Sequence, residues 1–272
     1  MDARTRLYFI FGDPIDHVRA PLVWTRLFER NSVDAVFLPA HASPANFDTA
    51  VAGVQRIENV DGLMFTMPFK VDALRHCARV TPRGQRVGVI NLMRREPDGS
   101  WTGDNVDGAG FLVGLAEDGV AIAGRRVYLH GCGGVGQNLA WTLAAEPIAC
   151  LTVHDIDAER ASRLADGIRQ ATGANVVAGP IDAEACDLAI NASPVGVHEE
   201  DPLPFDVDRL SGTAVVADVI MEPVLTRLLK AAQGRGLRIH HGRHMMHHAL
   251  PLAADFYRLP TDRSWHIDGL PA

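Results

Sequence analysis

Short apolar runs alternate with stretches of helical apolar spacing along the first hundred residues. Runs of four to seven apolar residues predict buried strands, and apolar residues that recur every three or four positions predict helices. We expect helices over residues 21–31 and 45–57, and strands over residues 7–11, 35–39, 60–66 and 89–95. This strand–helix alternation predicts an α/β fold with a mainly parallel sheet.

The same rhythm starts again after Gly124. The pattern predicts helices over 135–145, 158–172 and 224–234, and strands over 126–130, 150–154, near Val176, and over 188–191 and 215–218. A last helix, 243–257, lies beyond this series, so we expect it to pack back on the first half. We therefore predict two domains: a substrate-binding catalytic domain over 1–106, to which 241–272 return, and a Rossmann domain over 107–240. The tail after Pro260 is polar and rich in turn residues, which predicts a loosely ordered segment.

Composition narrows the class of protein. The chain has 272 residues, of which 47% are apolar and 22% charged, and its net charge is −7. The acidic balance disfavours nucleic acid as a partner. No apolar run approaches the roughly 20 residues that span a membrane, and the charged first residues do not resemble a signal peptide. The four widely spaced cysteines are typical of reduced thiols, so we expect a cytoplasmic protein. Its oligomeric state stays open, a homodimer included.

A glycine-rich turn follows the predicted strand 126–130. Gly131, Gly133 and Gly136 match G-x-G-x-x-G, between a strand and a helix. The first glycine permits a tight turn, the second lets the backbone approach a pyrophosphate, and the third allows close packing. We predict a dinucleotide site that includes Gly134 and Val135. The alternative is that these glycines form only a turn.

Asp155 follows the next predicted strand, 24 positions beyond Gly131. A carboxylate there accepts hydrogen bonds from the ribose hydroxyls of NAD and repels the 2′-phosphate of NADP. The local sequence runs Asp155, Ile156, Asp157, with no arginine directly after it, so we expect no cation close to these carboxylates. We therefore predict NAD as the cofactor, with NADP disfavoured. The alternative is that Asp155 only caps the following helix.

Lys70 and Asp107 lie in polar segments at predicted strand ends. Ligands in open α/β sheets bind outside the carboxyl ends of strands. A lysine beside a carboxylate relays a proton when its surroundings tune its pKa. Hydride removal from an alcohol carbon needs such a partner, because the hydroxyl proton must also leave. The alternative is that both are ordinary solvated surface residues.

Seven segments, in order, resemble motifs of the shikimate dehydrogenase family, and the resemblance covers about residues 8–257. The segments are 12–17 (G-D-P-I-D-H), 66–70 (T-M-P-F-K), 88–91 (G-V-I-N), 103–108 (G-D-N-V-D-G), 191–196 (N-A-S-P-V-G), 218–229 and 242–245. The resemblance implies an oxidoreductase that moves a hydride between a nicotinamide and a secondary alcohol or ketone of a cyclic hydroxy-acid.

The resemblance also implies roles for single residues. Lys70 and Asp107 would be the catalytic pair, and Thr66 and Asn91 would line the substrate pocket. The segment 191–196 would bring Asn191 and Ser193 to the cofactor. Where many NADP-using members carry N-R-T, this chain has residues 155–157, as in the NAD-using branches.

The departures from the family pattern fall on substrate contacts. The family's S-x-S-P, whose hydroxyls hold the shikimate carboxylate, is Val18-Arg19-Ala20-Pro21 in this chain, so both hydroxyls are missing. Apolar residues also replace the family's asparagine, tyrosine and glutamine, at Met64, Met221 and Ala249, although a one-residue shift of the alignment puts His248 at the last of these positions. A site that loses several hydroxyl-binding groups binds a polyhydroxylated substrate much less tightly. We expect a less hydroxylated or more apolar cyclic hydroxy-acid than shikimate. Arg19 is expected to bind its carboxylate, with His17 and His248 lining the pocket.

Five histidines crowd the end of the chain: His240, His241, His244, His247 and His248. The spacing of His244 and His248 suits one helix face, but Met245 replaces the glutamate of H-E-x-x-H, so we predict no metal. Besides a dehydrogenase with an altered substrate, the sequence leaves three alternatives: a shikimate or quinate dehydrogenase proper, a cofactor-binding regulator without turnover, and a metal-dependent hydrolase. Retention of Lys70, Asp107 and Asn91 argues against a pure binder.

Overall fold

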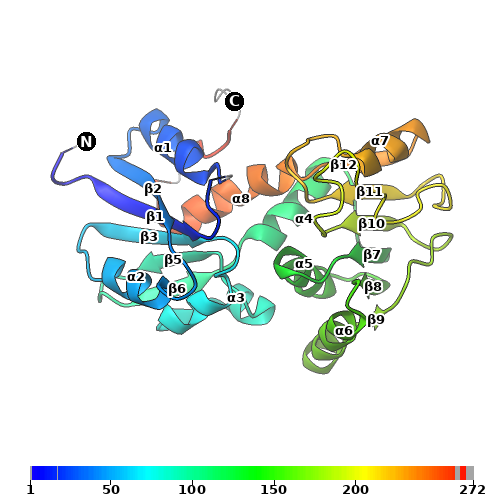
Figure 1. The fold of residues 1–272 in the computed structure, drawn as a ribbon, viewed down its shortest axis with the longest axis horizontal. Helices are drawn as coiled ribbons and strands as arrows, with labels where there is room; N and C mark the ends of the chain where they lie inside the picture. The colour runs from blue at the N-terminus through cyan, green and yellow to red at the C-terminus, as the bar shows by residue number, and fades with distance from the viewer. Residues whose placement is uncertain (1, 17, 261–263, 268–272) are drawn as a thin grey trace. The chain divides into compact units, whose positions relative to one another are not determined.

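The computed structural model of the chain describes residues 2–16, 18–260 and 264–267 (Figure 1). The chain divides into two units: a first unit, Met1–Val106 with Ala249–Ala272, and a second unit, Asp107–His248. The division after residue 106 coincides with the predicted boundary, whereas the return to the first unit begins at Ala249 instead of residue 241. Among the described residues, no helix has the length and apolar character that crossing a bilayer requires.

The first unit is built on a six-stranded sheet with the order β2-β1-β3-β5-β6-β4. Its strands are β1 (Arg6–Gly12), β2 (Ala35–His41), β3 (Val60–Phe65), β4 (Arg79–Val80), β5 (Leu92–Arg95) and β6 (Trp101–Asp104). β1 pairs in parallel with β2 and β3, but β5 runs antiparallel to both β3 and β6. The sheet is therefore mainly parallel, as predicted, and only β5 runs against the other strands, because Leu92–Arg95 and Trp101–Asp104 form a hairpin that needs no crossover helix.

Helices and apolar clusters cover both faces of this sheet. The helices are α1 (Ala20–Arg30), α2 (Phe47–Val54), the 3₁₀ helix η1 (Asp72–His76), α3 (Pro82–Val87) and the C-terminal part of α8 (Arg243–Phe256). Alternation along β1 sends Tyr8 and Ile10 into one buried cluster and Phe11 into the other. The cluster around Tyr8 includes Tyr257, whose hydroxyl donates to the carbonyl of Leu63 at 2.9 Å. The C-terminal helix thus packs on the first unit, as predicted.

Part of the C-terminal tail belongs to the same core. Trp265 is buried against α1 residues, and its indole N–H donates to the carbonyl of Pro260 at 3.0 Å. The side-chain amide of Asn31 donates to the carbonyl of Ser264 at 2.8 Å. The prediction of a loosely ordered tail is wrong for residues 264–267, since one large aromatic side chain anchors them.

The second unit is a six-stranded parallel sheet with the order β12-β11-β10-β7-β8-β9. Its strands are β7 (Arg126–His130), β8 (Cys150–His154), β9 (Val176–Ala178), β10 (Leu188–Asn191), β11 (Val215–Asp218) and β12 (Arg238–His240). Its helices are α4 (Asp107–Glu117), α5 (Gly134–Ala144), α6 (Ala158–Thr172), α7 (Arg227–Gly234) and the start of α8. This arrangement is the predicted Rossmann fold, and it places the ends of β7, β8 and β10 along one edge of the sheet.

Candidate active site

The glycine turn joins β7 to α5 and needs glycine for steric reasons. Gly131 has φ +100°, a backbone conformation that other residues rarely adopt. A Cβ on Gly136 would lie 1.9 Å from the carbonyl oxygen of Gly131, so the first turn of α5 approaches the loop more closely than any side chain allows. Gly133 and Gly134 are exposed, with open space where a Cβ would stand. Val135 packs against the core of the unit. The turn therefore leaves the backbone N–H groups at the start of α5 accessible to an anion.

Asp155 lies beside this turn, directly after β8, and is buried. One carboxylate oxygen accepts from the N–H of Cys132 at 2.7 Å, and the other accepts from the N–H of Asp157 at 2.9 Å. Burial opposes ionisation, but these two hydrogen bonds and the nearby charge of Arg160 outweigh it and lower the pKa of Asp155. The predicted acid therefore lies at the glycine turn as a carboxylate. Because the turn and this acid occur together, the residues fit a dinucleotide cofactor.

Arg160 is a neighbour of Asp155 that sequence reasoning missed. Its guanidinium lies 3.4 Å from Oδ1 of Asp155 and 3.6 Å from a carboxylate oxygen of Asp157. The expectation that no cation stands close to these carboxylates is therefore wrong. Asp157 caps α6 by accepting the N–H of Arg160 at 3.0 Å, and this cap turns the arginine back toward the strand end. An aspartate followed three residues later by arginine was the available signal.

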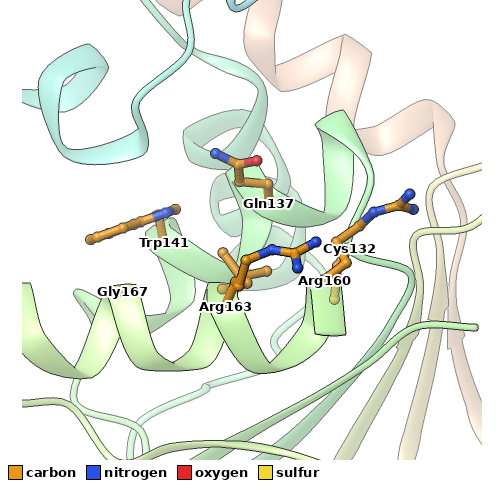
Figure 2. Close-up of a pocket in the computed structure, with 7 residues that line it drawn as sticks. Cys132, Gln137, Trp141, Arg160, Arg163 and Gly167 are labelled. Atoms are coloured by element: carbon orange, nitrogen blue, oxygen red, sulfur yellow. The ribbon is translucent and has the colours of Figure 1, made fainter. Parts of the chain in front are cut away.

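A cavity of 280 Å³ lies between α5 and α6, next to these residues (Figure 2). Its walls combine apolar groups with two guanidinium groups: Cys132, Gln137, Trp141, Arg160, Arg163, Leu164 and Gly167. Figure 2 shows Gln137 and Trp141 on one helix and Arg163 on the other. The cavity belongs to the second unit alone, and its Cys132 and Arg160 both contact Asp155.

Asn191 and Ser193 build the loop that packs against the glycine turn. The side chain of Asn191 is fully enclosed, donates to the carbonyl of Val195 at 2.9 Å and accepts the Ser193 hydroxyl at 2.7 Å. A Cβ on Gly131 would lie 2.7 Å from the backbone nitrogen of Ser193. The enclosed amide of Asn191 therefore holds the shape of this loop. Ser193 is only half-buried.

Asp218, at the end of β11, is fully buried beside Asn191. It accepts from the amide of Asn191 at 3.2 Å, the hydroxyl of Thr226 at 2.8 Å and the N–H of Ile220 at 3.0 Å. Burial nevertheless raises the pKa of this carboxyl to about 6, because the three donors do not fully replace water. The loop at the end of β10 therefore rests on an acid that titrates close to neutral pH.

In the first unit, Thr66 and Lys70 lie on a segment tied to two strand ends. The N–H of Thr66 donates to the carbonyl of Phe11 at 3.0 Å, and the N–H of Ile90 donates to the carbonyl of Lys70 at 3.0 Å. A Cβ on Gly12 would lie 2.6 Å from Cγ2 of Thr66, so glycine at the end of β1 makes room for the threonine. Thr66 and Lys70 are half-buried.

Asn91 is buried and holds the segment that leads to Asp107. Its Oδ1 accepts from the N–H of Val106 at 3.1 Å, and its own N–H donates to the carbonyl of Asp104 at 3.0 Å. The carboxylate of Asp104 is fixed in turn by the guanidinium of Arg83. Asp107, half-buried, is the first residue of α4 and belongs to the second unit. Thr66, Lys70 and Asn91 therefore lie in the first unit, whereas Asp107 is the first residue of the second unit.

The other three residues predicted to contact the substrate do not share one environment. Arg19 is exposed at the N-cap position of α1, where its side chain makes no capping bond. His17 lies outside the described residues. His248 is buried in the second unit, with Nε2 at 3.6 Å from a carboxylate oxygen of Glu117.

Four of the positions where the chain departs from the family pattern share one environment. Four partly buried apolar residues pack against the cluster around Tyr8 in the first unit: Val18, Ala20, Met64 and Ala249. Met221, in the second unit, is 40% exposed. Apolar packing therefore replaces hydrogen-bonding groups at these four positions without disturbing the core.

Comparison with known proteins matches both units. Residues 10–93 match the family model of the shikimate dehydrogenase substrate binding domain. The chain is 30% identical over 248 residues to the shikimate dehydrogenase (NADP(+)) of Geobacter metallireducens, covering 88% of this chain and 86% of that protein. It is 32% identical to the shikimate dehydrogenase (NADP(+)) of an Anaeromyxobacter species, over 89% of this chain and 87% of that protein.

Two solved structures of enzymes with other names show the same fold. The quinate dehydrogenase of Corynebacterium glutamicum in complex with NAD superposes with a TM-score of 0.83 at 29% identity, covering 93% of each chain. The ligand-free 5-ketofructose reductase of a Gluconobacter species superposes with a TM-score of 0.86 at 26% identity, covering 96% of each chain. This architecture therefore occurs in proteins named for different substrates.

Proposed function

Because the chain belongs to the shikimate dehydrogenase family, we propose that it is an NAD-dependent dehydrogenase for a cyclic hydroxy-acid with fewer hydroxyl groups than shikimate. At the coarser level, the chain is an NAD(P)-dependent oxidoreductase that acts on CH–OH groups. Two finer points are our proposal: the preference for NAD, and the less hydroxylated substrate. The observation that carries the second is the group of four apolar positions in the same unit as Thr66, Lys70 and Asn91.

The preference for NAD rests on Asp155. Its ionised carboxylate beside the glycine turn accepts ribose hydroxyls and repels a 2′-phosphate. Arg160 weakens this argument, since a guanidinium attracts phosphate. Two carboxylates, those of Asp155 and Asp157, already pair with that guanidinium, so the three groups together keep a net negative charge. The shikimate dehydrogenases to which we compare the chain are named for NADP, which makes this preference a sharp test of the proposal.

The chain supplies the positioning and the proton transfer of the reaction. When bound, NAD supplies the hydride acceptor. Gly133 and Gly134 would hold its pyrophosphate through backbone N–H groups, and Asp155 would hold its ribose. We assign the proton released from the substrate hydroxyl to Lys70, with Asp107 as its relay partner. Thr66 and Asn91 would orient the alcohol.

The substrate proposal follows from what the four apolar positions can and cannot bind. Val18, Ala20 and Met64 offer no hydrogen bond to a ring hydroxyl or a carboxylate. A ring hydroxyl that loses its partner on binding costs about 1–3 kcal/mol, which is roughly tenfold to a hundredfold in affinity. A ring with fewer hydroxyls meets no such cost, and Arg19 is our choice to bind its carboxylate.

A substrate panel with the purified full chain tests the proposal. The panel contains shikimate, quinate and cyclohexane or cyclohexene carboxylic acids that carry a single ring hydroxyl, each with NAD and with NADP. We expect the monohydroxy acids with NAD to give kcat/KM at least about tenfold above shikimate. Equal or faster oxidation of shikimate or quinate would favour a shikimate or quinate dehydrogenase proper, and a preference for NADP would overturn the role of Asp155.

A cofactor-binding regulator is the outcome to distinguish from a missing substrate. NAD binding is measured by calorimetry on the same preparation. Tight NAD binding without turnover of any acid in either direction would favour the regulator. Turnover that Lys70→Ala abolishes while NAD binding persists would support the dehydrogenase.

A further inference from the structure

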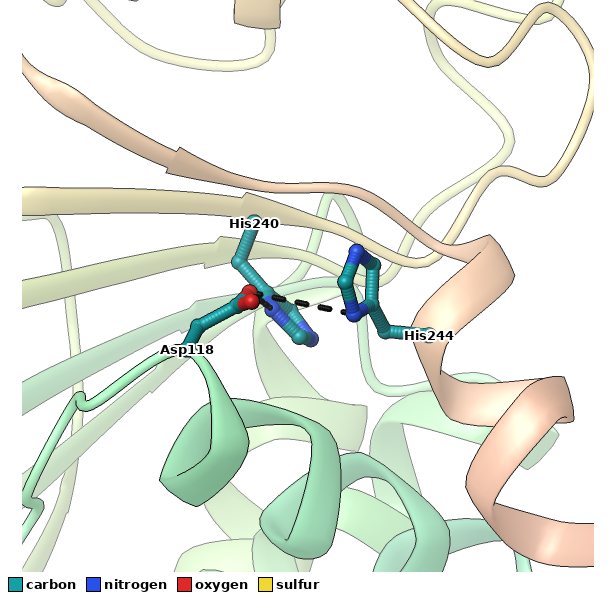
Figure 3. A group of neighbouring side chains, drawn as sticks. All are labelled: Asp118, His240 and His244. Carbon is teal, nitrogen blue, oxygen red and sulfur yellow. Dashed lines mark hydrogen bonds and ion pairs between the residues drawn. The ribbon is translucent and has the colours of Figure 1, made fainter.

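Three side chains of the second unit converge away from any role assigned above (Figure 3). Asp118 directly follows α4, His240 ends β12, and His244 lies in the first turn of α8. One potential ligand atom from each residue lies within 4.8 Å of the other two. Nδ1 of His240 is 2.6 Å from Oδ2 of Asp118, and Nδ1 of His244 is 3.8 Å from the same oxygen.

We propose that Asp118, His240 and His244 bind a divalent transition-metal ion, with Zn²⁺ as the ion of choice. The site is structural: it ties the end of α4, the end of β12 and the start of α8 together. It does not depend on the proposed dehydrogenase activity. It replaces the expectation of no metal, which rested on the missing glutamate after His244 and did not include Asp118.

The spacing of the three groups suits a tetrahedral ion. Metal–nitrogen and metal–oxygen bonds of about 2.0–2.2 Å place neighbouring ligand atoms roughly 3.3–3.5 Å apart. The two distances from Oδ2 of Asp118, 2.6 and 3.8 Å, lie on either side of this value. Small side-chain shifts of Asp118 and His244 would therefore seat an ion, and His240 can keep the position that the core gives it.

Burial fixes the ring of His240 beside Asp118. The side chain of His240 has no exposed surface, and its Nδ1 is the nitrogen that faces the carboxylate of Asp118. A ring that the core already holds in place needs little rearrangement to bind an ion through this nitrogen.

A neighbouring histidine orients the ring of His244. In metal sites, residues next to the ligands often fix the ligand rings in the same way. Nε2 of His244 contacts Nε2 of His241 at 3.1 Å, so only one of these two nitrogens carries the proton. When His244 donates it, the lone pair of its Nδ1 faces Asp118, as coordination requires. Gly114 of α4 presents no side chain to the rings: a Cβ there would lie 3.0 Å from Cβ of His244 and 3.1 Å from Cε1 of His240.

The chemistry of the three ligand groups determines which ion they prefer, and their exposure to solvent determines whether an ion can reach them. Two imidazoles and a carboxylate suit Zn²⁺, Co²⁺ or Ni²⁺ better than Ca²⁺ or Mg²⁺, which prefer oxygen ligands alone. The side chains of Asp118 and His244 are 29% and 27% exposed, so an ion can enter from solvent. Three protein ligands leave one position of the tetrahedron for water.

Metal titration of the full chain tests the site. The protein is freed of metal with a chelator and titrated by calorimetry with Zn²⁺, and with Co²⁺ as a spectroscopic probe. We expect one ion per chain with a Kd on the order of micromolar or tighter, and visible Co²⁺ absorption bands of tetrahedral intensity. Thermal unfolding should shift upward with Zn²⁺.

Variants assign the site to these residues. Asp118→Asn and His244→Gln replace partly exposed side chains with similar shapes, so both should fold, which circular dichroism of the metal-free proteins checks. Each should weaken Zn²⁺ binding at least about 100-fold. His247→Ala, a histidine on the same helix outside the three-residue group, is the matched control and should bind as the unaltered chain does. Absence of one-to-one binding, unchanged affinity in both ligand variants, or an equal loss in the control would overturn the proposal.

Discussion

The two units keep the family pattern to different degrees. In the second unit the glycine turn is complete, and Gly131 and Gly136 are each required by a close backbone approach. In the first unit Thr66 and Asn91 keep their backbone ties, while Val18, Ala20 and Met64 present apolar side chains at expected substrate contacts. Cofactor binding relies on backbone groups that few sequences can supply, whereas substrate choice relies on side chains that can be exchanged without changing the fold.

The largest expected effect on turnover comes from removing the proton-transfer groups. These groups are needed whether the substrate is shikimate or a less hydroxylated acid. Lys70→Ala and Asp107→Asn should each lower kcat/KM by roughly 10²–10⁴-fold, because general acid–base catalysis contributes that much. NAD affinity should stay within about threefold of the unaltered chain. Steady-state kinetics on the best substrate and calorimetry with NAD measure both quantities. Lys230→Ala, at an exposed lysine of α7, is the control and should change neither; a loss of NAD binding with turnover would indicate a structural role for Lys70 or Asp107.

The second effect concerns the backbone contact in the glycine turn. Gly136→Ala places a methyl group 1.9 Å from the carbonyl oxygen of Gly131, so α5 or the turn must move. We expect a loss of stability on the order of 1–3 kcal/mol in urea unfolding, and at least about a tenfold loss in NAD affinity. Gly53→Ala in α2 is the control, since no atom lies within 4 Å of its Cβ position; it should stabilise the chain by up to about 1 kcal/mol. Normal NAD binding by Gly136→Ala would contradict the steric argument.

The third effect sharpens the choice of cofactor. Asp155→Asn removes the charge that repels a 2′-phosphate and leaves Arg160 with one carboxylate partner fewer. The ratio of kcat/KM for NADP to that for NAD should rise by roughly tenfold to a hundredfold. Asp166→Asn, at an exposed carboxylate of α6 that pairs with Arg169, should leave the ratio unchanged. Were the ratio equal in the Asp155 variant and the unaltered chain, the carboxylate would not discriminate between the two cofactors.

A fourth effect concerns the pH dependence of stability in the second unit. Burial raises the pKa of Asp218 from 3.8 to about 6, so its favourable contribution is fully present below about pH 4 and is lost as the pH rises through about 6. Relative to Asp218→Asn, the unaltered chain should lose on the order of 2–3 kcal/mol of unfolding free energy between pH 4 and pH 7. Taking the difference between the two chains cancels the other titrating groups. A difference that does not change with pH would show that Asp218 stays ionised throughout.

The sequence predicted the second unit more closely than the first. Strands β7, β8, β10 and β11 lie at the predicted residues, because parallel strands in a doubly wound sheet are continuous apolar runs. The hairpin of β5 and β6 was partly missed, since β6 contains Gly103 and Asp104, which are uncommon in strands. The antiparallel direction of β5 follows from this hairpin, so a sequence pattern that misses β6 also misses the direction of β5.

Helix α4 shows why propensity alone failed. It contains Gly108 and Gly114, which lower helix propensity, so no helix was predicted there. A Cβ on Gly108 would lie 2.1 Å from the hydroxyl oxygen of Thr142 on α5, so this glycine allows the two helices to pack closely. Tertiary packing overrides the local preference.

The candidate site was predictable where motifs carry it, and not where neighbours come from elsewhere in the chain. The glycine turn and Asp155 followed from spacing, whereas the contact of Arg160 with Asp155 depends on how α6 begins. The group of Asp118, His240 and His244 joins residues 122 positions apart, so only the fold brings it together.

Restoring the amide of the family pattern at position 64 tests the central claim most directly. The variant Met64→Asn is compared with the unaltered chain by kcat/KM for shikimate and for the best monohydroxy acid, both with NAD. If the apolar side chain of Met64 disfavours shikimate, one regained hydrogen bond of about 0.5–1.5 kcal/mol to a ring hydroxyl should raise kcat/KM for shikimate by roughly twofold to tenfold, with no gain for the monohydroxy acid. An unchanged value for shikimate, or an equal rise for both acids, would contradict the account.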